Sequence, residues 1–173
     1  MPRSGKSQHS APQPRLRRAY YDCRYGQLHL HNAIPPGGGF DELTSVLCLH
    51  DQDEGGQVFL PAMQALGAQR SVYAFDLPGV GGTDAAPGVP PVDAAVHVAC
   101  DFLDSMRIRQ VDVIARGRAA PAALRLLEQR GAAVRRVVLV DAAGSVPVAP
   151  QLTALTAAEA TPQRLVELLA PTA

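Results

Sequence analysis

Short apolar runs rich in β-branched residues alternate along this chain with longer runs of alanine and leucine at helical spacing. That alternation is typical of βαβ units, which build a parallel sheet with helices packed on its faces. With 173 residues and 47% hydrophobic composition, the chain is long enough to bury one core. The pattern therefore predicts an α/β fold with a mostly parallel, doubly wound sheet.

The first 18 residues differ in character from the rest of the chain. Five basic residues between Arg3 and Arg18 precede the first acidic residue, Asp22, and prolines interrupt the stretch. Prolines work against the amphipathic helix that an organelle-targeting peptide needs. We interpret residues 1–18 as a disordered basic tail outside the fold.

Strands and helices are expected in alternation after this tail. Two short runs, Ala19–Arg24 and Gln27–Asn32, flank Tyr25-Gly26 and predict an antiparallel hairpin that starts the sheet. The further predicted strands are Ser45–His50, Ser71–Phe75, Val111–Ile114 and Val137–Val140. The predicted helices are Gln57–Leu66, Val92–Met106, about Ala119–Gln129, and a last helix that begins at Thr161-Pro162 and runs through Leu169.

Charge and composition restrict the classes of partner. Lys and Arg together equal Asp and Glu at 16 each, so no overall field favours nucleic acid or an anionic membrane. The three cysteines are widely spaced, which does not suggest a disulfide framework. No apolar run approaches the length of a membrane span, and no secretory signal is visible. We expect no nucleic-acid or membrane partner and a cytoplasmic location.

Three segments, taken in order, resemble the α/β-hydrolase family over about Tyr20 to Ala143. Leu47–His50, followed by a loop and a helix, resembles the oxyanion-loop region. Residues 72–83, VYAFDLPGVGGT, are similar to the family's strand and D-x-P-G-x-G-x-S turn, and this is the most specific match. Residues 111–120, VDVIARGRAA, stand where the family carries a strand and its G-x-S-x-G nucleophile elbow.

The resemblance implies a sheet of the α/β-hydrolase type that is incomplete at its carboxy-terminal side. Residues 19–143 would form the hydrolase-like core, and residues 144–173 would be the start of a cap-like or lid-like segment. The strand Val137–Val140 would then be an open edge of the sheet. Such an edge invites a second copy or a complementing chain.

The predicted elbow lacks its reactive residue. Ala115 and Ala119 keep the small flanks, but Gly117 occupies the nucleophile position. Glycine tolerates the strained backbone of the elbow and has no side chain that attacks a carbonyl. The resemblance implies a catalytic histidine after the nucleophile, whereas all five histidines precede Gly117. We therefore expect no catalytic residues in this chain.

The segment that resembles the oxyanion loop is His50, Asp51 and Gln52. In the family the histidine here is usually structural, and the next residue is usually glycine. Asp51, with Asp53 and Glu54 nearby, would oppose a developing oxyanion. Residues 51–56 depart from a calcium-loop pattern in their glycine position and lack its spaced glutamate, so we expect neither a metal nor a cofactor.

A rival interpretation applies to the turn at residues 115–120. Its A-x-G-x-x-A spacing between a strand and a helix resembles a dinucleotide-binding turn, in which Gly117 would admit a pyrophosphate to the helix N-terminus. Arg116 and Arg118 would add positive charge. With Asp76 and Asp141 they form the predicted ligand pocket, although Asp141 is better explained as an ordinary strand-end residue than as a catalytic acid.

Three functional hypotheses follow from the sequence. The favoured one is an α/β-hydrolase-like pseudoenzyme, with a binding or scaffold role, or a truncated hydrolase that has lost its chemistry. The second is a module that binds a nucleotide or another anion at residues 115–120. The third is a diverged ester or epoxide hydrolase that another chain completes. A small-molecule or anionic ligand is expected in the first two cases.

Overall fold

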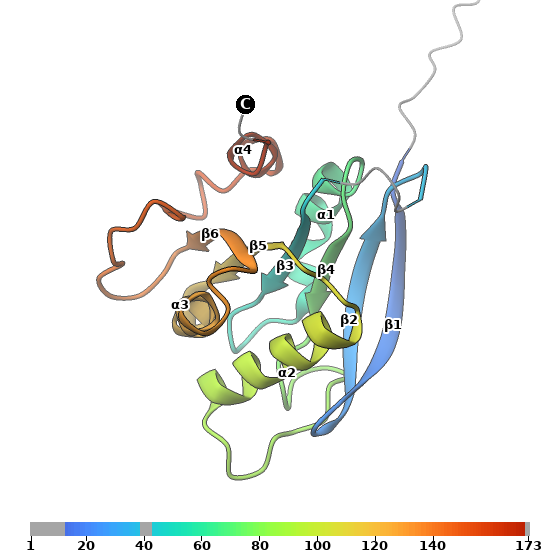
Figure 1. The fold of residues 1–173 in the computed structure, drawn as a ribbon, viewed down its shortest axis with the longest axis vertical. Coiled ribbons are helices and arrows are strands. Elements are labelled where there is room, and N and C mark those ends of the chain that lie inside the picture. Colours follow the sequence, from blue (N-terminus) through green and yellow to red (C-terminus); the bar gives the residue numbers. More distant parts are fainter. Residues whose placement is uncertain (1–12, 39–42, 172–173) are drawn as a thin grey trace, which may run out of the picture.

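A computed structural model of the chain describes residues 13–38 and 43–171, in which seven strands form one sheet (Figure 1). The strand order is β1-β2-β4-β3-β5-β6-β7. The first two strands are β1 (Arg15–Cys23) and β2 (Gly26–Ile34), and the others are β3 (Ser45–Leu49), β4 (Val72–Phe75), β5 (Val111–Arg116), β6 (Val134–Val140) and β7 (Leu152–Leu155).

The sheet is parallel except at the end formed by the predicted hairpin. β2 pairs antiparallel with β1 and with β4, and every other neighbouring pair is parallel. β3 and β4 are almost entirely buried, because helices cover both faces of the sheet and their apolar runs fit that position. The predicted mostly parallel α/β sheet is confirmed.

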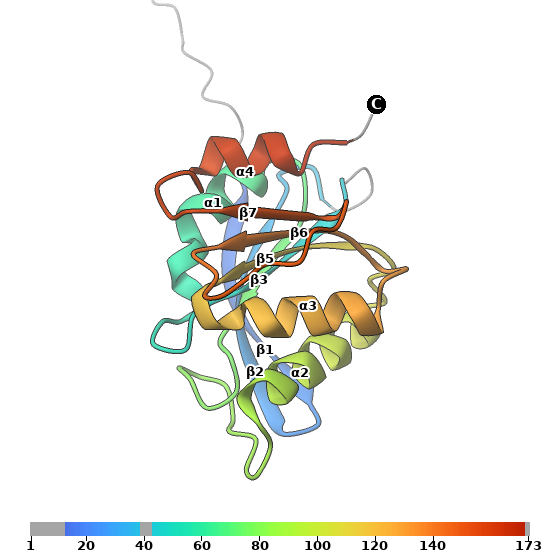
Figure 2. The same cartoon turned by 90° about the vertical axis from the view of Figure 1, so that its left-hand side faces the viewer.

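Helices cover the sheet on both faces (Figure 2). On one face lie α2 (Pro91–Ser105) and α3 (Ala120–Gln129), and on the other lie α1 (Leu60–Leu66) and α4 (Pro162–Leu168). Two short 3-10 turns, η1 (Gly56–Phe59) and η2 (Gly117–Ala119), lead into α1 and α3. Each face has its own hydrophobic core, so the sheet is doubly wound.

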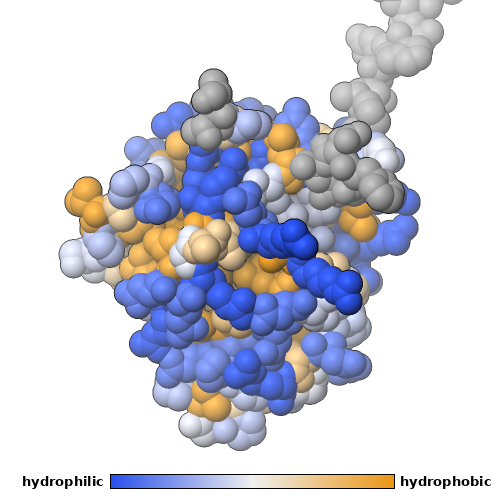
Figure 3. All heavy atoms as spheres, in the orientation of Figure 1, coloured by the Kyte–Doolittle hydropathy of each residue, from blue (hydrophilic) through white to orange (hydrophobic). Residues whose placement is uncertain are grey.

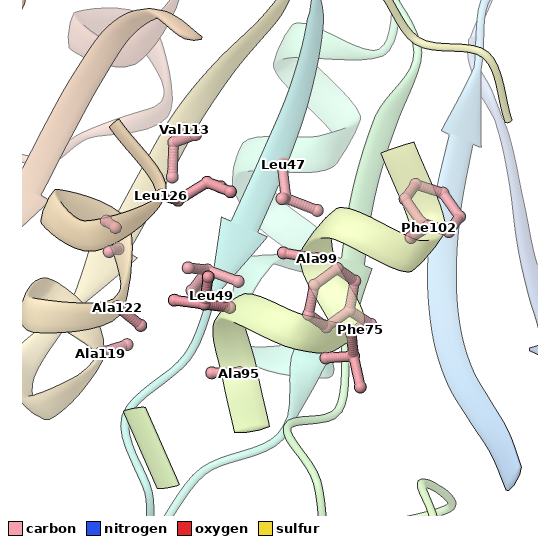
Figure 4. Packing of buried hydrophobic residues seen from close by; sticks show 14 of the residues in the cluster. Leu47, Leu49, Phe75, Ala95, Ala99, Phe102, Val113, Ala119, Ala122 and Leu126 are labelled. Carbon is pink, nitrogen blue, oxygen red and sulfur yellow. The ribbon is translucent and has the colours of Figure 1, made fainter. Parts of the chain in front are cut away.

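Small residues bring the two long helices close to the sheet (Figure 4). Ala95 and Ala99 of α2 and Ala122 of α3 are buried against the sheet in the larger core, together with Leu49. Alanine keeps the helix backbones near the strands and loses little side-chain entropy on burial. The carboxyl ends of β3, β4 and β5 are therefore closely flanked by the first turns of α2 and α3.

The first strand is longer than the sequence predicted. Residues 15–18 pair with β2 from Ile34 to His31, so they belong to the sheet and the assignment of these four residues to the tail is wrong. Their side chains are exposed, which is why the charges looked like those of a tail; arginines also discourage edge-to-edge pairing with other chains. Residues 1–12 of the predicted tail lie outside the described residues.

The end of the chain adds a strand that the sequence did not predict. β7 pairs in parallel with β6, with Val137 opposite Leu152, so the predicted open edge at Val137–Val140 is wrong and the outer edge is β7. α4 begins at the predicted cap, where the Thr161 side chain accepts a hydrogen bond from the Arg164 amide at 3.2 Å. Leu165 of α4 is buried in the same core as α1.

The last helix is fastened to the sheet by a buried charge group. Asp112 of β5 is fully buried and accepts hydrogen bonds from Arg135 Nε at 2.8 Å and Arg70 Nη1 at 3.4 Å. Arg135 also donates to the Leu169 carbonyl at 2.9 Å. Residues 152–169 thus belong to the sheet and its cover, while the interpretation of residues 144–173 as the start of a cap stays a prediction.

The surface carries both hydrophobic and hydrophilic side chains. On the face shown in Figure 3, hydrophobic side chains show at several places across the middle and hydrophilic side chains separate them. Within the described residues, no helix combines the length and apolar character that crossing a membrane requires.

Candidate functional site

The predicted elbow is a strand-to-helix corner at the carboxyl end of β5. β5 ends at Arg116, η2 begins at Gly117, and α3 follows directly. Gly117 has a φ of +52°, in the left-handed region where a side chain is strained and glycine is not. β5 lies between β3 and β6 in the parallel part of the sheet. The backbone shape that the sequence implied is therefore present.

The space above Gly117 is filled by Asp51. A Cβ atom added to Gly117 would lie 1.9 Å from Asp51 Oδ2 and 2.6 Å from Asp51 Cγ. Neither contact is possible, so no side chain fits at residue 117 while Asp51 keeps this position. The carboxylate of the loop after β3 therefore lies directly above the turn at Gly117.

The Asp51 carboxylate accepts hydrogen bonds from one backbone amide of its own loop and from one backbone amide of the corner. Gln52 N donates to Asp51 Oδ1 at 2.6 Å, and the backbone amide of Arg118 donates to the same carboxylate. In the α/β-hydrolase fold the amide that follows the nucleophile and an amide of the loop after β3 form the oxyanion hole. In this chain the Asp51 carboxylate accepts two amides of this kind, and its expected effect on an oxyanion stays a prediction.

The charge on Asp51 is stabilised despite partial burial. Burial acts to raise the pKa of Asp51, but the hydrogen bonds from the Arg118 side chain and from the Gln52 and Arg118 amides outweigh it and lower the pKa. Arg118 Nε donates to Asp51 Oδ1 at 2.7 Å. Asp51 is therefore an anion at neutral pH.

Two arginines of the turn hold the acidic loop that follows β3. Arg118 also pairs with Asp53, and its Nη1 donates to Gln52 Oε1 at 3.3 Å. Arg116 Nη2 lies 3.1 Å from Glu54 Oε1. We call this group the acidic clasp: Asp51, Gln52, Asp53, Glu54, Arg116 and Arg118. Because each arginine already has an acidic partner, the turn offers little free positive charge to a ligand.

His50 supports the loop through the backbone. Its Nε2 accepts a hydrogen bond from the Leu77 amide at 2.8 Å, and its Nδ1 lies 2.5 Å from the Asp51 carbonyl oxygen. Only a neutral ring with the proton on Nδ1 satisfies both contacts. With both nitrogens engaged on the backbone and the side chain fully buried, His50 holds the loops after β3 and β4 together.

Asp76 fastens the glycine-rich turn that follows β4. Its Oδ1 accepts the Gly56 amide at 2.8 Å, and its Oδ2 accepts the Gly82 amide at 3.0 Å and His29 Nδ1 at 2.8 Å. Burial acts to raise the pKa of Asp76, yet these three hydrogen bonds outweigh it and the pKa is lowered. Asp76 is thus a framework residue, buried behind the turn.

An apolar cavity of about 210 Å³ lies beside the corner. Its wall is formed by the loop after β4, the first turns of α2 and α3, and two members of the clasp. The lining residues are Gln52, Leu77, Pro78, Val80, Pro91, Val92, Ala95, Arg118, Ala119 and Ala122. Only Gln52 and Arg118 bring polar side chains to it.

None of four cavities formed by the described residues is lined by all four residues of the predicted ligand pocket. Arg118 lines the apolar cavity, whereas Arg116 lines a separate one of about 190 Å³ beside α4. Asp141 lines a third, wide depression, and its Oδ1 accepts the Ala157 amide at 2.7 Å. Asp76 is buried behind the glycine-rich turn. The grouping of these four residues into one ligand pocket therefore stays a prediction.

Comparison with known proteins identifies the fold. The sequence matches no protein-family model, and no curated protein matches it. The structure is similar to an epoxide hydrolase from an endophytic Streptomyces, at 22% identity and a TM-score of 0.63 over 78% of this chain and 38% of that one. An epoxide hydrolase from Vigna radiata gives 22% identity, a TM-score of 0.64, and 78% and 40% coverage.

An esterase has the same arrangement. The naproxen esterase of Bacillus subtilis is 16% identical, with a TM-score of 0.66 over 76% of this chain and 45% of that one. All three proteins have the α/β-hydrolase fold. This chain spans 38% to 45% of their lengths.

Proposed function

We propose that this chain, which has the α/β-hydrolase fold, binds a small and largely apolar molecule and catalyses no hydrolysis. One observation carries the proposal: the Asp51 carboxylate fills the space above Gly117 and accepts the amides of Gln52 and Arg118. A hydrolase of this fold needs a nucleophile above the corner and an oxyanion hole free to receive the substrate. Among the described residues the place above the corner holds a carboxylate that already accepts two amides, which supports the proposal.

The Asp51 carboxylate is a poor substitute for the missing nucleophile. Its charge is shared among the Arg118 guanidinium and two amides, and the lowered pKa means a weaker base. An ester formed on Asp51 would need a general base to hydrolyse it. His50, the neighbouring histidine, has both nitrogens on the backbone, and His97 lies 2.5 Å from the Tyr25 hydroxyl.

The cavity beside the corner defines the ligand class. Eight of its ten lining residues are apolar and its volume is about 210 Å³. An apolar cavity of about 150 Å³ binds benzene, so a substituted benzene or a short branched hydrocarbon has the right size. A single polar substituent would hydrogen-bond to Gln52 at the rim.

A nucleotide or another anion is a weaker candidate for this site. Its phosphate would need the helix end that Asp51 already occupies, and both arginines of the turn are paired with carboxylates. We expect calorimetry with NAD or NADP to give no binding heat. Tight binding that an Arg116→Gln, Arg118→Gln double variant abolishes would replace our proposal with the nucleotide hypothesis.

The inactivity is tested with p-nitrophenyl acetate and styrene oxide as substrates. We expect the purified chain and its Asp51→Asn variant to give the same rates as buffer. Asn keeps the shape of the side chain and removes its nucleophilic charge, so it is the matched control. Turnover by the unmodified chain that Asp51→Asn abolishes would show a working carboxylate and overturn the inactive assignment.

The binding function is tested by titration with indole or toluene, followed by backbone amide shifts. We expect shifts at residues that line the apolar cavity, and at least tenfold weaker binding in Val92→Trp, whose side chain would fill it. Val148→Trp is the control, since Val148 is fully exposed and does not line the cavity. Equal affinity in both variants would argue against this site.

A further inference from the structure

A cluster of metal-ligating side chains lies away from the clasp and the apolar cavity. It consists of His29 and His31 from β2 and Asp76 from the end of β4, and their ligand atoms lie within 4.8 Å of one another. The two histidines are two residues apart in a strand, so their side chains leave the same face. The pairing of Leu30 with Phe75 brings Asp76 beside them.

We propose that His29, His31 and Asp76 form a binding site for a divalent transition-metal ion, with Zn²⁺ as the best match. Two imidazole nitrogens and one carboxylate oxygen are a donor set that zinc, cobalt and nickel accept. Magnesium and calcium require oxygen donors and fit it poorly. Ligand atoms around one tetrahedral zinc stand roughly 3.3 Å apart, so side-chain rotations need to close each separation by at most about 1.5 Å.

The cluster already contains one close pair of ligand atoms. His29 Nδ1 and Asp76 Oδ2 are 2.8 Å apart, which is near the spacing of two ligands on the same ion. The amides of Gly56 and Gly82 hold the Asp76 carboxylate in place at 2.8 and 3.0 Å. Such outer contacts orient a metal ligand before the ion arrives. The ion would replace the proton that His29 and Asp76 share.

The surroundings admit water to the two histidines and weaken the binding of an ion in one respect. Both histidines are partly exposed, so water has access to complete the coordination. The Tyr20 ring lies 5.0 Å from the His29 ring and covers one side. Arg18 stands opposite His31 across the β1–β2 pair, and its charge opposes a cation.

The sequence predicts no metal, because its one local stretch with the character of a metal site, the acidic run at residues 51–56, departs from a calcium-loop pattern. Asp76 is 47 residues from His29, and only the antiparallel pairing of β2 with β4 makes them neighbours. None of the three residues lines the apolar cavity. This inference therefore stands or falls independently of the proposed ligand and of the inactivity.

The test is calorimetry of the full chain with ZnCl₂ after treatment with a chelator. We expect one ion per chain, and at least tenfold weaker binding in His31→Gln. His97→Gln is the matched control, because His97 is a partly buried histidine outside the cluster. Arg18→Gln should bind more tightly. If His31→Gln binds as well as the unmodified chain, or His97→Gln loses as much affinity, the site is wrong.

Two further readouts separate the cluster from other donors. Co²⁺ should give the weak visible bands of nitrogen and oxygen ligands, without the strong near-ultraviolet band of a cysteine thiolate. Zn²⁺ should raise the melting temperature of the unmodified chain and leave that of His31→Gln unchanged. Metal-free melting curves of the two proteins show whether the variant folds. A thiolate band, or an equal rise in a folded His31→Gln, would contradict the proposal.

Discussion

Asp51 and Asp76 follow neighbouring parallel strands, and both carboxylates accept hydrogen bonds from backbone amides, yet their structural roles differ. The Asp76 side chain is 4% exposed and joins the Gly56 amide, the Gly82 amide and His29. The Asp51 side chain is 29% exposed and is held largely by Arg118, itself about half exposed. Asp76 holds the loops at the edge of the sheet together, whereas Asp51 fills the space above Gly117.

The difference lies in what remains when each carboxylate is removed. Without Asp76, the Gly56 and Gly82 amides would be left without an acceptor behind the glycine-rich turn, where solvent has little access. Without Asp51, the freed amides lie beside partly exposed side chains and water reaches them. An unsatisfied buried donor costs much more than one that water can satisfy. Removing the Asp76 carboxylate should therefore lower the stability of the fold much more than removing the Asp51 carboxylate.

The largest expected effect is that of Asp76→Ala. Leaving buried donors without an acceptor costs about 1–3 kcal/mol for each, so the free energy of unfolding should fall by on the order of 3 kcal/mol. Urea unfolding in the presence of a chelator measures it, with Asp51→Ala as the matched control. If both variants lose the same free energy of unfolding, the proposed difference between the roles of Asp76 and Asp51 is wrong.

The Gly117→Ser substitution should cause the next largest loss of stability. A side chain in the left-handed region costs about 1–2 kcal/mol, and the new Cβ would collide with Asp51 Oδ2. Asp51→Gly should relieve the collision, so the double variant should be more stable than the sum of the single changes predicts. Urea unfolding of the four proteins gives the coupling. Strict additivity would show that Asp51 does not fill this space in solution.

Acid should weaken the contribution of Asp76 before it unfolds the chain. The pKa of Asp76 is lowered in the folded state by its amide and histidine hydrogen bonds, which outweigh the effect of burial. Its stabilising contribution is therefore full above the unfolded pKa, about 3.9, and is lost as the pH falls through the folded value. The stability difference between the unmodified chain and Asp76→Asn should shrink below about pH 4. A difference that stays constant from pH 6 to pH 3 would contradict this.

Much of the fold was predictable from the sequence, because the buried parallel strands are continuous apolar runs. The residue ranges expected for β3, β4 and α2 agree with the structure to within about one residue at each end. β7 was missed because Leu152–Leu155 is short and only half-buried, so it carries no such run. Burial on both faces leaves a clear signal in the sequence, and an edge strand does not.

The candidate site was predictable only in part. The strand-to-helix turn at Gly117 could be predicted from the local sequence, and the structure gives it a positive φ. The clasp did not, because Asp51 and Arg118 are 67 residues apart and become neighbours only when β3 pairs with β5. Seen without their acidic partners, Arg116 and Arg118 resembled an anion site. The pairing order of the strands decides whether such a charge is free, and local motifs do not contain that order.

The smallest expected change in stability, and the most direct test of the comparison, is that of Asp51→Gly. Water can replace a partly exposed carboxylate, so only a fraction of the Asp76→Ala loss should appear. The amides of Gln52 and Arg118 would then be free to bind a small carboxylate. Titration with sodium formate, against sodium chloride at equal ionic strength, should shift the Gly117 and Arg118 amide signals in this variant. Asp53→Asn, which keeps Asp51 in place, should show no such shift. If formate moves these signals equally in the unmodified chain, in Asp51→Gly and in Asp53→Asn, Asp51 does not act as an internal anion at the corner.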